Sequence, residues 1–271
     1  METQEGMREI KKNIAIVLGV IAIVWLFTPV PTLLASSLWN HYHASSLALA
    51  LDRTDAPLAF IIGTDAFGGS TYDLSLAMRA FQKATAIDSG LLWSHYQLAR
   101  VLFVEGKLNN AEMEIDSELA HNPENLRALY IRGLIRAYDK NLAGAESDFK
   151  RFTEWAPTEW AGYNDLAWVL GQEGKYAEAK TALEKGFKNA VSAATNPWLW
   201  NNLGVQELNL EEYKDAINSF EKAKTLAANM SEKTWTSSYP GNDPSGSAGG
   251  IEAFQKTIQT NLENAYFKPL K

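Results

Sequence analysis

The sequence predicts an all-α fold: an N-terminal transmembrane helix, then an α-solenoid of about four to five stacked helix pairs, then a capping helix. Three observations support this prediction. Short motifs recur about every 34 residues between residues 71 and 230, and a long uncharged stretch precedes them. The composition, 46% hydrophobic and 21% charged, is sufficient for a packed core. A period of this length is typical of helix–turn–helix units, which bury their apolar faces only by stacking.

The first predicted element is a membrane segment at residues 14–35, after a short tail at residues 1–13. Ile14–Phe27 is almost continuously apolar, and the uncharged stretch continues well beyond it. A bilayer requires about 20 residues of helix, which this continuation supplies. We expect Pro29 and Pro31 to kink or end the regular helix near its far end.

The charges around this segment predict its orientation. Arg8, Lys11 and Lys12 lie on the near side, and Arg53 is the first basic residue on the far side. Positive charges favour the cytoplasm. The segment is therefore expected to act as a signal anchor, with the N-terminus cytoplasmic and the repeats outside the cytoplasm, which is the periplasm in a bacterium. Two alternatives stay open: a buried core helix, and a cleaved signal peptide, which the large Leu33 near the candidate cleavage site disfavours.

Residues 36–70 are expected to form a juxtamembrane segment and a loop. Pro57 and Gly63 lie among further glycines, a composition that favours turns over residues 55–69. Residues 71–90 match only the second helix of a unit, so the array is expected to begin with a half repeat or with an atypical partner helix.

Four full units follow, expected at residues 92–125, 126–159, 160–193 and 197–230. Each carries a small residue in its first helix, at Ala99, Gly133, Ala167 and Gly204. Each then has an Ala and, four residues later, a large apolar residue: Ala111 and Ile115, Ala145 and Phe149, Ala179 and Leu183, Ala216 and Phe220. The small residues are expected to let two helices approach closely, and the large ones to fill the space between neighbouring units.

The fourth unit shows the pattern most clearly, with W-x2-L-G at residues 200–204. These residues resemble the tetratricopeptide repeat (TPR) family, whose period and pattern they share. The resemblance covers roughly residues 73–230. The second unit departs from it, because Arg132 and Arg136 stand where Leu and another large apolar residue are usual.

The resemblance implies a concave groove, lined by the first helix of each unit, that holds an extended peptide or a partner helix. Matching offsets place ten side chains on that surface: Trp93, Tyr96, Arg100, Arg127, Tyr130, Asn164, Trp168, Trp198, Asn201 and Asn202. Aromatic and Arg side chains are frequent anchors, and Asn can pair with a peptide backbone. Trp168 and Trp198 are equally compatible with core packing. Exposure is favoured for Tyr96, Arg100, Arg127, Tyr130 and Asn164.

Some proteins of this family clamp a C-terminal carboxylate with a cluster of Lys, Asn and Arg. The matching positions here are Tyr96, Arg100, Ile131, Ala161 and Asp165. Arg100 is the one basic residue among them, and Asp165 is an acid. Binding of a C-terminal carboxylate is therefore not expected.

After the array, residues 231–250 form a Gly/Ser/Pro-rich stretch that predicts a flexible loop. Residues 251–271 are expected to form a helix and a short tail. The helix has one apolar face, made by Ile251, Phe254, Ile258, Leu262 and Tyr266. We expect it to cap the last unit; the alternative is a partner-binding helix on a tether.

The composition excludes several function classes. The net charge is −7, and it all comes from residues after 53, because residues 1–53 hold four acids and four bases. Nucleic-acid binding is therefore not expected. The absence of Cys excludes thiolate chemistry and Cys-ligated metals. His41 and His43 are two residues apart, not the four that a helical metal pair needs. No phosphate-binding loop, catalytic residue, cofactor, metal or small-molecule substrate is indicated, and an enzyme is not expected.

Three hypotheses about function follow. The first is a membrane-anchored scaffold that binds a polypeptide partner in the groove and supports assembly or stability of a membrane or envelope complex. The second is a structural subunit held through its transmembrane helix and convex face, with no groove activity. The third is an enzyme whose site is not visible in the sequence.

Overall fold

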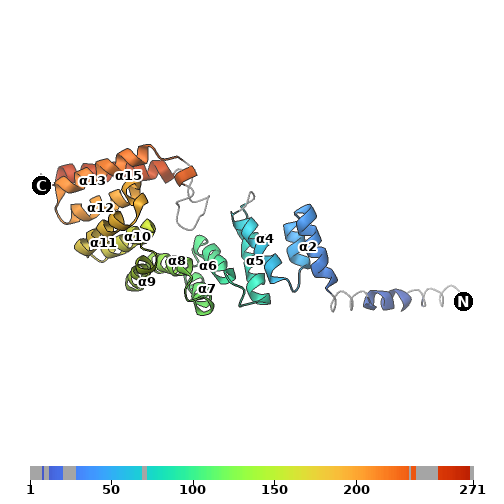
Figure 1. The fold of residues 1–271 in the computed structure, drawn as a ribbon. Coiled ribbons are helices and arrows are strands. Elements are labelled where there is room, and N and C mark those ends of the chain that lie inside the picture. Colours follow the sequence, from blue (N-terminus) through green and yellow to red (C-terminus); the bar gives the residue numbers. More distant parts are fainter. Residues whose placement is uncertain are drawn as a thin grey trace. The chain divides into compact units, whose positions relative to one another are not determined.

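The computed structural model describes residues 8, 12–20, 29–68, 72–231, 233–235 and 250–268. These residues form helices and no strand, so the predicted all-α class is confirmed. The chain divides into two compact units, Met1–Ser94 and His95–Lys271. Figure 1 shows the helices of both.

The predicted membrane segment is described only at its two ends. Residues 12–20 are helical and expose their apolar side chains, whereas residues 21–28 lie outside the described part of the chain. Pro29 is not helical, and α2 (Val30–Tyr42) begins directly after it. Proline is favoured at such a start, because the first turn does not use its missing N–H group. In the ranges given above, no helix has both the length and the apolarity to cross a bilayer.

The expectation of a loop at residues 55–69 is wrong. After α3 (Ser45–Leu51), the chain forms α4 (Ala56–Gly68), most of whose side chains are buried. Gly63, for which the composition predicts a turn, lies inside this helix. A Cβ atom there would lie 2.7 Å from the ring of Phe81 in α5 (Leu74–Ile87). The glycine therefore permits close helix packing.

It follows that residues 71–90 are not a half repeat. α5 has a complete partner in α4, and the alternative of an atypical first helix is correct. The spacing of this pair differs from that of the later units. Gly63 and Ala77 are 14 residues apart, whereas the equivalent residues in the later units, such as Gly133 and Ala145, are 12 apart. Two additional residues in the connection take this pair out of register.

The four full units are present with nearly the predicted bounds. Their helices are α6 (Ser94–Val104) and α7 (Leu108–His121), α8 (Leu126–Tyr138) and α9 (Leu142–Trp155), α10 (Trp160–Gln172) and α11 (Tyr176–Asn189), and α12 (Pro197–Asn209) and α13 (Tyr213–Ala228). A short 3-10 helix, η1 (Val191–Thr195), lies between the last two units. It accounts for a step of 37 residues there in place of 34. Asn side chains cap three of the helices by accepting backbone N–H bonds, at Asn125, Asn141 and Asn196.

The period also appears in the backbone. Within each unit, the turn between the two helices contains one residue with a positive φ: Gly106 at 73°, Lys140 at 67°, Gly174 at 75° and Glu211 at 64°. This conformation ends a helix by satisfying its last carbonyl groups. Glycine adopts it freely, whereas Lys140 and Glu211 do so at some steric cost.

Each helix pair is held by a small residue opposite a large one. A Cβ at Gly133 would lie 2.7 Å from the Phe149 ring, and a Cβ at Gly204 would lie 2.7 Å from the Phe220 ring. Where the small residue is Ala, as at Ala167, the residue at the same offset is the smaller Leu183. These residues are fully buried, so the volumes balance inside each pair.

The unusual Arg residues of the second unit bind one buried carboxylate. Asp148 is 3% exposed, and Arg132 and Arg136 each donate to it at 2.8 Å. Arg132 also pairs with Asp116, and Arg136 with Glu112, both on α7. An ionic network therefore replaces the apolar contacts that are usual at these positions.

The C-terminal helix caps the array, as predicted. α15 (Gly250–Phe267) runs alongside α13 (Figure 1) and buries Ile258, Leu262 and Ala265 against it. Tyr266 does not belong to the buried face; it is 48% exposed and donates to Glu221. Trp235, inside the predicted loop, is 7% exposed and packs against aromatic rings. Residues 236–249 of that loop lie outside the described part.

The small–large pairing gives a direct prediction. Gly204→Ala should lower the free energy of unfolding by about 1–3 kcal/mol, because the added methyl group overlaps the Phe220 ring. Phe220→Leu in the same chain should recover part of this loss, since Ala167 and Leu183 show that the smaller combination packs. Urea unfolding of the four proteins in a double-mutant cycle measures the coupling. Strictly additive losses would contradict the account.

Candidate functional site

Helices α10, α12 and α15 surround a hollow of about 580 Å³, here called the amide groove. Its lining residues are Asn164, Trp168, Gly171, Gln172, Tyr176, Trp198, Asn201, Asn202, Val205, Gln206, Asn209, Thr257 and Asn261. Five of the ten side chains proposed from the sequence meet here: Asn164, Trp168, Trp198, Asn201 and Asn202. α15 also contributes, through Thr257 and Asn261, which are not among the ten residues that the sequence predicts.

Amide side chains dominate this groove and are partly bonded to one another. Asn202 Nδ2 donates to the carbonyl oxygen of Asn164 at 2.8 Å, and Gln206 Nε2 donates to Asn202 Oδ1 at 2.8 Å. Asn261 Nδ2 donates to Asn201 Oδ1 at 3.1 Å, which connects α15 to α12. Since each amide carries two donor hydrogens and an acceptor oxygen, the groove keeps capacity to bind a polar backbone.

Gln206 is the deepest of these amides. The residue is 2% exposed, and within the described ranges its Oε1 accepts no hydrogen bond. Gly171 makes space for it, because a Cβ there would lie 2.9 Å from Oε1. A buried acceptor without a partner is unfavourable, so an N–H group entering the groove would be stabilised here.

Trp198 forms part of an aromatic cluster at one end of the groove. Its ring centroid lies 5.9 Å from Trp160, 5.4 Å from Trp235 and 5.5 Å from Phe254. The core-packing interpretation therefore fits Trp198, which is half-buried. Trp168 is 39% exposed and keeps surface for a partner.

A second hollow of about 310 Å³, here called the Asp165 pocket, lies between α8 and α10. It is lined by Leu134, Ala137, Tyr138, Lys140, Phe149, Asn164, Asp165 and Trp168. Asn164 and Trp168 also line the amide groove, so the two hollows share a wall.

Asp165 is half-buried, and within the described ranges its two hydrogen-bond donors are neutral. Tyr130 Oη donates to Oδ2 at 2.5 Å, and Asn164 Nδ2 donates to Oδ1 at 3.0 Å. Burial raises the pKa of Asp165 to about 6, although both hydrogen bonds act to lower it. Burial also raises the pKa of Tyr130 well above its usual value, and the adjacent Asp165 carboxylate adds to this.

The remaining predicted residues have different environments. Tyr96 is 8% exposed, so its expected exposure is wrong; Arg100 lies over its ring at 5.6 Å and donates to Gln97. Tyr130 is also not freely exposed, because its ring packs against Phe149 and Phe152. The position of a residue in the repeat predicts which face of its helix it lies on. It does not predict which side chains of neighbouring helices cover that face.

Arg127 is exposed, as expected, but it lines neither hollow. Trp93 belongs to the N-terminal unit and lies in the turn before α6, with φ of 72°.

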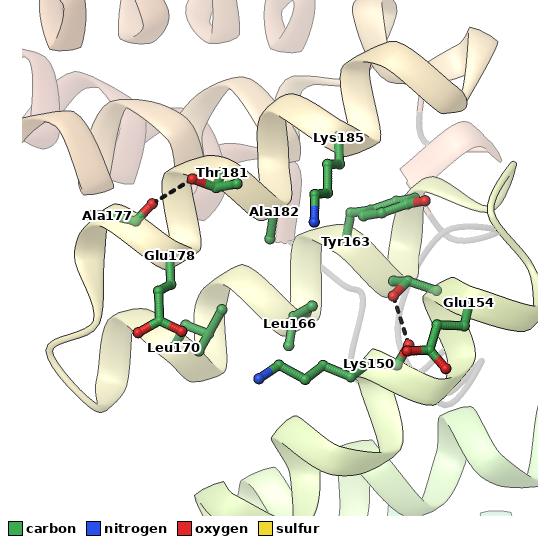
Figure 2. A pocket seen from close by; sticks show the side chains of 11 residues that line it. Lys150, Glu154, Tyr163, Leu166, Leu170, Ala177, Glu178, Thr181, Ala182 and Lys185 are labelled. Atoms are coloured by element: carbon green, nitrogen blue, oxygen red, sulfur yellow. Dashed lines mark hydrogen bonds between the residues drawn. The ribbon is translucent and has the colours of Figure 1, made fainter.

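A third hollow lies on the opposite helix face, between α9 and α11 (Figure 2). It measures about 500 Å³ and is here called the outer hollow. Leu166, Leu170 and Ala182 form its apolar part, while Lys150 and Lys185 lie around it with Glu154 and Glu178. Two carboxylates and two ammonium groups balance, so the hollow has no preference for one sign of charge.

Among the described residues, His95 lies against a carboxylate and a second histidine. His95 Nδ1 lies 2.6 Å from Glu114 Oε2, and its ring stacks on His121 at 6.1 Å. Across the described ranges, no group of three or more His, Cys, Asp or Glu residues is placed to hold a metal ion.

Comparison with known proteins identifies the repeats. The family model for the tetratricopeptide repeat matches residues 161–190 and 199–230, so these segments are TPR units. A comparison with curated protein sequences gives no match.

Solved structures share the fold. A crystal structure of MamA protein is 18% identical with a TM-score of 0.57, over 64% of this chain and 92% of that one. A crystal structure of YrrB, described as a TPR protein with an unusual peptide-binding site, is 19% identical with a TM-score of 0.56, over 69% and 93%. The structural similarity shows a helical solenoid of TPR type. At identities this low, it shows nothing about ligands.

The raised pKa of Asp165 has a consequence for stability. Its folded value of about 6 exceeds the unfolded value of about 4. The folded state therefore binds this proton more tightly, and ionisation weakens folding as the pH rises from about 4 to 6. Asp165→Asn carries no charge and should raise the free energy of unfolding at pH 7.5 by up to about 3 kcal/mol, with the gain vanishing near pH 4.

Urea unfolding between pH 4 and 7.5 measures this effect, with Asp139→Asn, an exposed acid close by in the sequence, as the matched control. A constant difference between wild type and Asp165→Asn across that range would show that Asp165 does not titrate as described.

Proposed function

We propose that this chain is a membrane-anchored scaffold whose TPR array binds a segment of another polypeptide in the amide groove. Through that contact it supports assembly or stability of a membrane or envelope protein complex. The observation that carries the proposal is the groove itself: amide side chains from α10, α12 and α15 converge on one hollow, with a buried acceptor at Gln206 and an exposed ring at Trp168. Main-chain N–H and C=O groups of an extended segment are the natural partners of such a surface.

Two further points support a polypeptide ligand. YrrB, which shares the fold, is a peptide-binding TPR protein by its description. The groove also combines an aromatic anchor with hydrogen-bonding groups, as protein-binding surfaces commonly do. No catalytic function is proposed.

The anchor is proposed from the sequence. Ile14–Phe27 is nearly all apolar, and Arg8, Lys11 and Lys12 precede it on the side expected to be cytoplasmic. A membrane helix would hold the array beside membrane partners and raise their effective concentration without any new contact.

A second candidate function is favoured by the outer hollow (Figure 2). In this alternative the chain is a structural subunit, held through its membrane helix and its outer face, and the amide groove is not used.

Co-purification separates the two functions. The double variant Trp168→Ala, Asn209→Ala removes exposed groove contacts and should reduce recovery of the partner from cross-linked native membranes at least tenfold. The matched control Thr181→Ala, Lys185→Ala alters the outer hollow and should leave recovery unchanged. The reverse pattern would favour the structural subunit, as would loss of association when residues 14–34 are replaced by an unrelated membrane helix.

Topology has its own test. In sealed inverted vesicles, which expose the cytoplasmic face, added protease should leave the array at residues 95–268 intact, since we place it on the other side. Detergent should make it sensitive. Digestion without detergent would place the repeats in the cytoplasm and reject the proposed orientation.

A further inference from the structure

The Asp165 pocket contains an acid without a basic partner. The carboxylate receives hydrogen bonds from Tyr130 and Asn164, both neutral, and over the described ranges no ion pair is formed to it. Its surroundings include the apolar side chains of Leu134, Ala137 and Phe149. A carboxylate in such a place is poorly solvated, and its charge is unfavourable unless an opposite charge approaches.

Two more deeply buried carboxylates of the array have basic partners. Asp148, at 3% exposed, is bound by Arg132 and Arg136. Glu207, at 5% exposed, accepts from Ser219 and lies 4.0 Å from the ammonium of Lys180. Asp165 differs from these two in that both of its hydrogen-bond donors are neutral.

The walls of the pocket suit a cationic side chain. Trp168 and Tyr138 line it and are 39% and 57% exposed, so aromatic surface lies next to the carboxylate. Cations bind favourably over such rings. The chain makes the same contact internally, where the guanidinium of Arg151 lies 4.0 Å from the centre of the Trp155 ring.

We infer that the Asp165 pocket takes a lysine or arginine side chain of the polypeptide segment that occupies the adjoining amide groove. The inference rests on the proposed function. Asn164 and Trp168 line both hollows, so one extended segment can place its backbone along the amides and one basic side chain beside Asp165. The partner is thus a segment with a required basic residue, the opposite charge preference to a basic carboxylate clamp.

The titratable groups around this carboxylate are few. Tyr130 and Tyr138 come from α8, and Lys140 comes from the turn that follows it. From α9 the pocket receives Phe149, which does not titrate. Lys140 is exposed and carries the one ammonium group among the lining residues. Asp165 is therefore the group whose charge changes near neutral pH, and binding of a basic side chain should change with it.

A library of random octapeptides displayed on phage provides the first test. Selection against the full chain in detergent at pH 7.5 should enrich peptides with Lys or Arg at one fixed position. Selection against Asp165→Asn should still enrich peptides, but without that preference. Asp139→Asn removes a charge near the pocket without lining it, so it should keep the preference and control for general attraction of bases to an acidic protein.

The second test uses one selected octapeptide and calorimetry. Between pH 7.5 and 5, its Kd for the wild-type chain should rise about fivefold, because only about a tenth of Asp165 stays ionised one pH unit below a pKa of 6 and the protonated form should bind about tenfold more weakly. Asp165→Asn should bind the peptide about tenfold more weakly at pH 7.5 and show no such pH dependence. A peptide whose basic residue is replaced by norleucine should bind the wild-type chain about tenfold more weakly than the original peptide does. To Asp165→Asn, the two peptides should bind with equal affinity.

The outcomes are distinguishable. Enriched peptides without a basic preference, or equal pH dependence in wild type and Asp165→Asn, would overturn the Asp165 inference and leave groove binding in place. Failure to enrich any peptide with the wild-type chain would reject both groove binding and the inference that depends on it.

Discussion

The close approach of two helices within each unit is the constraint on which the structure depends. Three pairs achieve it with glycine against a phenylalanine ring, at Gly63, Gly133 and Gly204. The rings lie where a Cβ atom could not, so each phenylalanine side chain fixes both the separation and the register of its pair. Every later feature depends on this, because the side chains on the inner face reach a common groove only if successive pairs repeat the same geometry.

The repeat period predicted the helices of the array closely, because packing between pairs leaves a strong sequence pattern. The period does not predict α4, because two additional residues in the connection to α5 take this pair out of register. The composition around Gly63 therefore favours a turn, whereas this residue lies in a helix. Composition alone does not separate a glycine that permits a turn from one that permits contact. The cap helix was predicted from its apolar spacing, whereas burial of Trp235 within a Gly/Ser/Pro-rich stretch had no local signal.

The binding surface was predictable only in part, for a related reason. Offsets identified Asn164, Trp168, Asn201 and Asn202, which do share one hollow. They did not show that Tyr96 and Tyr130 are covered by neighbours, because burial depends on side chains from other helices. The sequence shows that Asp165 is an acid at a position where carboxylate-clamping TPR proteins carry a polar or basic residue. Its environment, however, depends on Tyr130 and on the rings of Trp168 and Tyr138. Two carboxylates of the array thus have different surroundings: Asp148 binds two arginines, whereas within the described ranges the donors to Asp165 are neutral.

The helix that follows the last unit has a consequence for how this kind of array can grow. An uncapped solenoid presents an apolar end that another copy could extend, in the way that a growing filament adds monomers. Here α15 occupies that end, with Ile258, Leu262 and Ala265 turned inward and the polar residues Glu252, Lys256 and Glu263 exposed. A further helix pair could be added at this end only if α15 were displaced from α13. The C-terminal helix therefore terminates the series and disfavours head-to-tail polymerisation from this side.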